Sequence, residues 1–134
     1  MTLNTLTSIN VTPLSINYGT ITANTNTSST NQSTTVANAG NSSTSLQVYS
    51  SLILTSGANN IPVGDQGYAT SPFTYPTGST AMTGSLSTVA GFLLTSPTST
   101  TNVTSTLYWG LMVPNNTATG TYGGTNVFAA LFHA

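Results

Sequence analysis

Short stretches of alternating apolar and polar residues run along most of this chain. Gly, Pro and Asn separate these stretches, and the helical period of 3.6 is almost missing. A period of two with such punctuation is typical of β-strands. The strongest stretch covers residues 103–113, and its apolar face carries Val103, Leu107, Trp109, Leu111 and Val113.

The same pattern predicts further strands over residues 2–12, 33–38, 46–54 and 86–94. Residues 14–21 continue after Pro13 as an edge segment or a second strand, because proline cannot donate a ladder hydrogen bond. Residues 56–80 are rich in Gly and Pro and predict a long connection with one or two short strands.

Residues 125–132 are apolar on both faces, which predicts a central strand, since a central strand is covered on both sides. About seven to nine strands separated by turns at short intervals indicate a sandwich. We therefore predict one all-β domain, an immunoglobulin-like or jelly-roll β-sandwich over residues 13–134, preceded by an N-terminal donor strand over residues 1–12. The aromatic residues assigned to its core are Trp109, Phe92 and Phe128.

Charge is almost absent from the chain. Its 134 residues include no Lys, Arg or Cys, Asp65 is the only acidic residue and His133 the only imidazole. Without cations, counterion-release binding to nucleic acid is excluded, and no apolar run is long enough to span a membrane. With so few titrating groups, the composition fits an extracellular location and predicts tolerance of acid.

No catalytic site, metal site or cofactor is expected. A nucleophilic triad would need Asp65 and His133 with one of many serines, but no Gly-x-Ser-x-Gly elbow is present and His133 lies at a frayed end. A calcium site normally uses several carboxylates. Asp65 stands alone between Gly64 and Gly67, which favours a turn with a side-chain cap.

Asn-x-Ser/Thr sequons predict N-glycosylation, which would make covalent glycans a partner of the chain. Ser, Thr and Asn are so abundant that chance produces a similar number of sequons. The polar surroundings favour Asn26, Asn31 and Asn41 as acceptors. The full set is Asn10, Asn26, Asn31, Asn41, Asn102 and Asn115.

Two parts of the chain resemble exported immunoglobulin-like modules. Residues 9–13 (INVTP), 16–21 (INYGTI) and 35–41 (TVANAGN) resemble their opening strands, and residues 113–122 (VPNNTATGTY) are similar to their VPxGTxxGTY closing hairpin, with Asn116 where Gly is usual. Within that class the chain looks like the TasA-like and archaeal thread or bundling-pilus subunits, although TasA-like proteins carry ample charge. The resemblance implies polymerisation by donor-strand complementation.

Open strand edges without charge favour self-association, and strand addition is one way to achieve it. We expect residues 2–12 to insert into the next copy, which gives an open filament. The predicted function is a structural subunit of an extracellular filament, a homopolymer at the cell surface. The alternatives are a surface-layer or viral coat protein, and a sugar- or ice-binding module. The side chains assigned as plugs of the donor strand are Leu3, Leu6, Ile9 and Val11.

Overall fold

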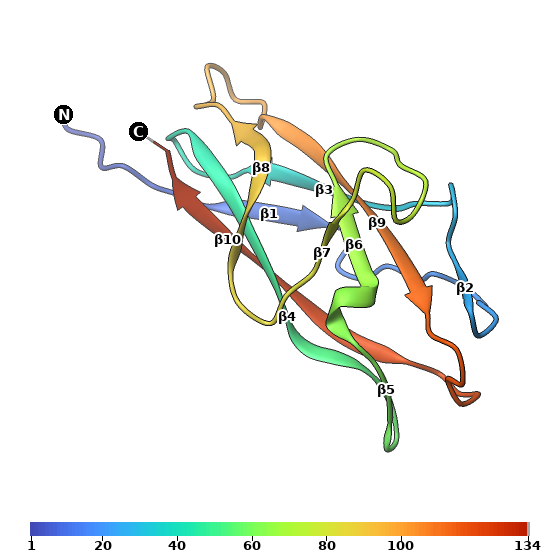
Figure 1. Cartoon of the computed structure of the whole chain (residues 1–134). Helices are drawn as coiled ribbons and strands as arrows, with labels where there is room; N and C mark the ends of the chain where they lie inside the picture. The colour runs from blue at the N-terminus through green and yellow to red at the C-terminus, as the bar shows by residue number, and fades with distance from the viewer. Residues whose placement is uncertain (134) are drawn as a thin grey trace.

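The computed structural model of the chain describes residues 1–133, without the side chains of residues 51–53. The described residues form an all-β sandwich of two antiparallel sheets (Figure 1), as predicted. The elements are β1 (Ile9–Thr12), β2 (Thr25–Asn26), β3 (Gln32–Asn38), β4 (Thr44–Ser56), β5 (Asn59–Ile61), the 3₁₀ turn η1 (Val63–Asp65), β6 (Gln66–Ala69), β7 (Thr80–Ala81), β8 (Ser87–Leu94), β9 (Thr104–Val113) and β10 (Gly123–Phe132).

The first sheet has the order β1-β3-β9-β6-β7, and β2 pairs with β9 beyond the end of β3. In the second sheet β4 lies in the middle. β10 occupies one edge of β4, whereas β8 and β5 share the other edge. The described strands number ten rather than seven to nine, because elements as short as β2 and β7 leave no readable alternation in a sequence.

Alternation along the long strands builds the core. In β9 the predicted apolar face is confirmed, since Leu107, Trp109, Leu111 and Val113 are buried. β3 and the first half of β4 follow the same rule, with every second residue buried. Branched and aromatic side chains fit this pleated, half-covered surface, so the chain folds locally as its pattern indicates.

Trp109 lies at the centre of the core and is 1% exposed. Its indole N–H donates a hydrogen bond to Thr34 Oγ1 at 3.0 Å, so the polar atom of the ring is satisfied. The rings of Tyr68 and Phe128 both have their centroids 5.8 Å from it, in the tilted and edge-on arrangements that aromatic pairs prefer. Phe92 is also buried in this cluster, and Phe128 is partly buried against it.

β6 lies within residues 56–80, where the sequence pattern predicted a long connection with one or two short strands. It pairs with β9 inside the first sheet, with Gly67 opposite Gly110. The two glycines make room for the loop over residues 70–79, because a Cβ on Gly110 would lie only 3.0 Å from ring atoms of Phe73 and Tyr75. A strand whose packing partner is a loop has little apolar alternation of its own.

The prediction of a central strand over residues 125–132 is wrong. Within residues 1–133, β10 pairs with β4 alone and forms an edge of the second sheet. Its partner register places Phe128 on the core face with Val48, whereas Val127 and Leu131 lie on the outer face. Both faces of β10 carry apolar residues as the pattern indicates, but its second edge has no strand partner among residues 1–133.

Three further expectations change with the structure. Of residues 2–12, only Ile9–Thr12 form a strand, and residues 14–21 form no strand. The connection over residues 114–122 is not a closing hairpin, because β9 and β10 belong to different sheets. The chain crosses the sandwich at that point.

Candidate functional site

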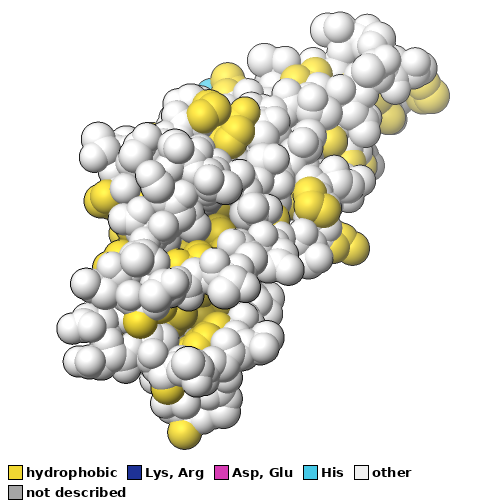
Figure 2. All heavy atoms as spheres, turned by 90° about the vertical axis from the view of Figure 1, so that its right-hand side faces the viewer, with side chains coloured by type: hydrophobic (Ala, Val, Ile, Leu, Met, Phe, Trp, Pro, Cys, Tyr) yellow, Lys and Arg dark blue, Asp and Glu magenta, His cyan; other side chains and the backbone are white. Residues whose placement is uncertain are grey.

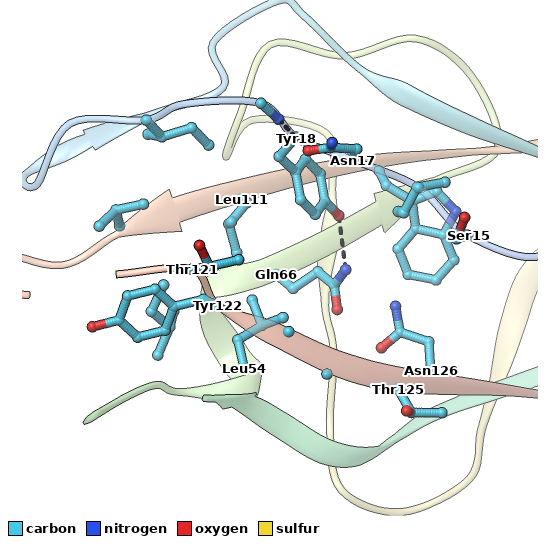
Figure 3. Close-up of a pocket in the computed structure, with 18 of the residues that line it drawn as sticks. Ser15, Asn17, Tyr18, Leu54, Gln66, Leu111, Thr121, Tyr122, Thr125 and Asn126 are labelled. Carbon is cyan, nitrogen blue, oxygen red and sulfur yellow. Dashed lines mark hydrogen bonds between the residues drawn. The ribbon is translucent and has the colours of Figure 1, made fainter. Parts of the chain in front are cut away.

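A cleft of about 950 Å³ opens between the two sheets on the side where β10 ends the second sheet. One wall is the segment 14–21, and the other is the start of β10 with the loop that precedes it. Figure 3 shows Ser15, Asn17 and Tyr18 across the cleft from Asn126 and from the labelled residues beside it. Leu54, Ile61, Leu111 and Val113 contribute apolar side chains to its lining.

The polar groups inside the cleft are neutral. Gln66 is 5% exposed, and its Nε2 donates a hydrogen bond to the Tyr18 hydroxyl at 2.7 Å. Burial raises the pKa of that hydroxyl above its ordinary value, and the hydrogen bond from Gln66 only partly offsets the rise. Tyr18 therefore stays protonated, and the site offers hydroxyl, amide and apolar surface without any charge.

The outer surface is similarly neutral. Figure 2 shows a face on which the white of backbone and uncharged polar side chains predominates, with yellow apolar side chains in its hollows and at its edges, a small cyan patch of histidine, and no dark blue or magenta. Asp65 lies on η1, and desolvation by burial raises the pKa of its carboxyl. Burial, followed by the charge of Asp65, raises the pKa of Tyr75, whose hydroxyl donates to the Asp65 main-chain oxygen at 2.9 Å.

The N-terminal arm, which we define as residues 1–8, projects past the end of the sandwich where the C-terminus also lies (Figure 1). Leu3 is 76% exposed and Leu6 is 55% exposed. Ile9 and Val11, the other two predicted plugs, belong to β1 and are partly buried against the core of their own domain. The structure thus divides the expected donor strand into an external arm and an edge strand.

Residues 39–42, which we call the latch loop, hold the second half of the arm. The N–H of Leu6 donates to Asn41 Oδ1 at 2.7 Å, and the N–H of Asn41 returns a bond to the Leu6 carbonyl at 3.0 Å. Asn41 Nδ2 donates to the Asn4 carbonyl at 2.8 Å, and Ser42 Oγ donates to the Leu6 carbonyl at 3.1 Å. The Ala39 N–H adds a bond to the Ser8 carbonyl at 3.0 Å.

Gly40 makes this contact possible. A Cβ at position 40 would fall inside van der Waals distance of the Leu6 carbonyl oxygen and would lie 3.0 Å from the Ser8 nitrogen. The sequence alone did not predict this contact. The arm and the latch loop are more than 30 residues apart in the chain, and no local pattern links them.

The predicted glycosylation sites differ in whether their side-chain amides form hydrogen bonds. The side chain of Asn31 bridges the main chain of Phe73, accepting from its N–H at 2.9 Å and donating to its carbonyl at 3.0 Å. The side chain of Asn41 is hydrogen-bonded to the arm, and Asn26 Oδ1 accepts from the Ser28 N–H. Asn10, Asn102 and Asn115 are exposed, and their amide nitrogens make no hydrogen bond among the described residues.

His133 and Asp65 do not come together as a catalytic pair. His133 Nδ1 lies 3.3 Å from Ser45 Oγ at the exposed end of β10, while Asp65 lies on η1 and shares no hydrogen bond with either. The turn predicted at Asp65 is present, but the cap is not a side chain, because the Asp65 N–H bonds to the Pro62 carbonyl. Over residues 1–133 no three His, Cys, Asp or Glu side chains cluster as metal ligands would.

The described part of the chain contains no helix that is long and apolar enough to cross a membrane. Comparison with protein-family models, with curated proteins and with solved structures finds no match to this chain. The features of the molecule that bear on its function are therefore the cleft, the edge of β10 and the arm.

Proposed function

We propose that this protein is a structural subunit of an extracellular filament, a homopolymer in which the N-terminal strand of one copy inserts into the next. One observation carries the proposal: an arm with uncharged side chains and exposed leucines precedes a domain that also has an open strand edge. A donor and an acceptor in one molecule are the two elements that strand addition needs.

The absence of charge supports self-association. Exposed edges are usually blunted with Lys, Pro or an inward-pointing charge, which prevents pairing between copies. β10 contains no charged residue and no proline over its ten residues, and no Lys or Arg exists anywhere in the chain to repel a neighbour. Such an edge is a hazard in a monomer but a requirement in a polymer.

The geometry supports an open fibre rather than a closed ring. The arm leaves one end of the sandwich, and the cleft lies toward the other end, around the start of β10. A contact between two different surfaces is heterologous, and it generates a helical filament when the rotation does not close. The extracellular location and glycans at Asn10, Asn102 or Asn115 belong to the same proposal, supported by the neutral composition and by the exposure of these amides.

Substituting the exposed leucines of the arm tests the proposal. The double variant Leu3→Ser/Leu6→Ser should form no filaments under negative-stain electron microscopy, because the inserted strand loses its apolar contacts. Leu86→Ser is the matched control, since Leu86 is 49% exposed on a different part of the surface. A variant without residues 1–8, which keeps β1, should also stay monomeric. Normal filaments from both arm variants would refute the assignment, and flat sheets or shells from the parent chain would favour the lattice alternative.

A further inference from the structure

β10 has the composition of a central strand in the position of an edge strand. Phe128 faces the core, and Val127 and Leu131 face outward, so both faces are apolar. Strands with this pattern are normally covered on both sides and paired at both edges. The mismatch indicates that one neighbour of β10 is missing from the single chain.

The hydrogen bonds of β4 show which main-chain groups of β10 face the open side. The Ser50 N–H donates to the Thr83 carbonyl at 2.9 Å, on the side of β4 that faces away from β10. The His133 N–H donates to the Ser43 carbonyl at 3.0 Å, so this pair is hydrogen-bonded. In an antiparallel ladder the bonded pairs alternate with the non-bonded pairs. Asn126 lies opposite Ser50, so Asn126, Phe128 and Ala130 direct their N–H and C=O groups away from β4.

The facing wall of the cleft has unpaired backbone too. Over residues 14–21 of the described chain, the Gly19 N–H, which bonds to Asn17 Oδ1 at 2.8 Å, is the only main-chain group with a hydrogen bond. Ile16 and Tyr18 point their side chains inward against the core, as alternate residues of a strand do. The cleft therefore lies between the open edge of β10 and a segment whose main-chain groups form almost no hydrogen bonds within the described chain.

These walls favour an extended polypeptide over a small ligand. A row of N–H and C=O groups at strand spacing is satisfied in register only by another extended backbone. The neutral lining also disfavours a charged peptide, whose charges would lose hydration without gaining a partner.

The arm of a second copy fits these requirements. It is neutral, carries the exposed side chain of Leu3, and eight extended residues reach about 26 Å, comparable with the length of a strand. Its own domain cannot use it in this way, because the arm leaves the sandwich at the end away from the cleft (Figure 1).

We propose that the cleft between residues 14–21 and β10 binds residues 1–8 of a second copy as an added strand on the edge of β10. This assignment rests on the proposed filament function and specifies its acceptor. β1 stays on β3 of its own domain, and Leu3 of the incoming arm enters the apolar lining around Leu54 and Leu111.

Cysteine cross-linking tests the acceptor directly, because the natural chain contains no cysteine. Full-length Leu3→Cys or Thr5→Cys protein is mixed with Asn126→Cys or Thr121→Cys protein and oxidised, and the products are separated without reductant. Thr121 is exposed and Asn126 is half-buried without a side-chain hydrogen bond among the described residues, so both changes are mild. Thr88→Cys, exposed on β8, is the control acceptor.

The expected result is a disulfide-linked dimer with Asn126→Cys or Thr121→Cys that exceeds the Thr88→Cys product by at least tenfold. Filaments without these cross-links would overturn the acceptor assignment and leave the filament proposal standing. Cross-linked dimers without filaments would support the acceptor and refute the filament. Absence of both would overturn the two together.

Discussion

Replacing Gly40 with alanine should free the N-terminal arm from the latch loop. The new Cβ collides with the Leu6 carbonyl and presses on the Ser8 nitrogen, and both are backbone groups that cannot rotate away. The φ of Gly40 is not in the left-handed region, so alanine itself fits the loop. The perturbation therefore acts on the contact rather than on the turn.

The magnitude follows from the six hydrogen bonds between the arm and the latch loop. Each contributes about 0.5–1.5 kcal/mol net, and ordering the arm offsets much of their sum. We take the net holding free energy as about 1–2 kcal/mol. Since 1.4 kcal/mol is a factor of ten, Gly40→Ala should raise the population with a free arm about tenfold.

Two assays measure the effect. Hydrogen exchange at the Leu6 amide, which bonds to Asn41 Oδ1, should become about tenfold faster. The concentration at which filaments appear, followed by pelleting, should fall by up to the same factor, because less free energy is spent on releasing the arm. Gly84→Ala is the control, since a Cβ there meets nothing within 4 Å.

Unchanged exchange at Leu6 in Gly40→Ala protein would refute the latch. Faster exchange with an unchanged or higher assembly concentration would show that the arm is held there but is not the inserting strand. The exchange measurement needs no filament, so it separates the two ideas.

Three further predictions concern the Asp65 carboxyl, the hydrogen bond of Thr34 and the pairing of β1 with β3. Burial raises the pKa of the Asp65 carboxyl, so the folded state binds this proton more tightly than the unfolded state does. The resulting stabilisation is fully present below the unfolded pKa of 3.8 and is lost as the pH rises through the folded pKa. The melting temperature at pH 3 should therefore be no lower than at pH 7, and a lower value would contradict this prediction. Thr34→Val leaves the Trp109 indole N–H without its acceptor and should lower the free energy of unfolding in urea by about 1–3 kcal/mol, with Thr35→Val on the same strand as a near-neutral control. In the double variant Thr12→Cys/Thr35→Cys, a disulfide between these register partners locks β1 onto β3 of its own domain. Filaments should still form. If they disappear on oxidation and return on reduction, β1 itself is exchanged between copies.

The sequence pattern predicted the strands whose alternation is strong. β9 and β3 appear close to the expected bounds, because every second side chain there is buried. The short strands expected within residues 56–80 could not be placed in this way, and β6 is one of them. Its Gln66-Gly67-Tyr68-Ala69 sequence has one large apolar residue, and the reason for its glycine is a loop that packs on it in space.

The candidate site depended even more on tertiary placement. The apolar character of β10 was visible in the sequence, but its lack of a second neighbour is a property of the sheet order. The prediction of a free strand over residues 1–12 anticipated the exposure of Leu3 and Leu6 but not the pairing of Ile9 and Val11 within the domain. A single sequence does not show where a strand leaves its fold.

The neutral lining of the cleft determines how the assembly would respond to its medium. Raising sodium chloride from about 0.01 M to 1 M shortens the Debye length from about 30 Å to about 3 Å, yet no side chain of the arm or of the cleft lining carries a charge for the ions to screen. Only strongly excluded salts such as sulfate should promote assembly, by strengthening apolar burial. A fibre joined in this way would hold equally well in fresh water and in brine.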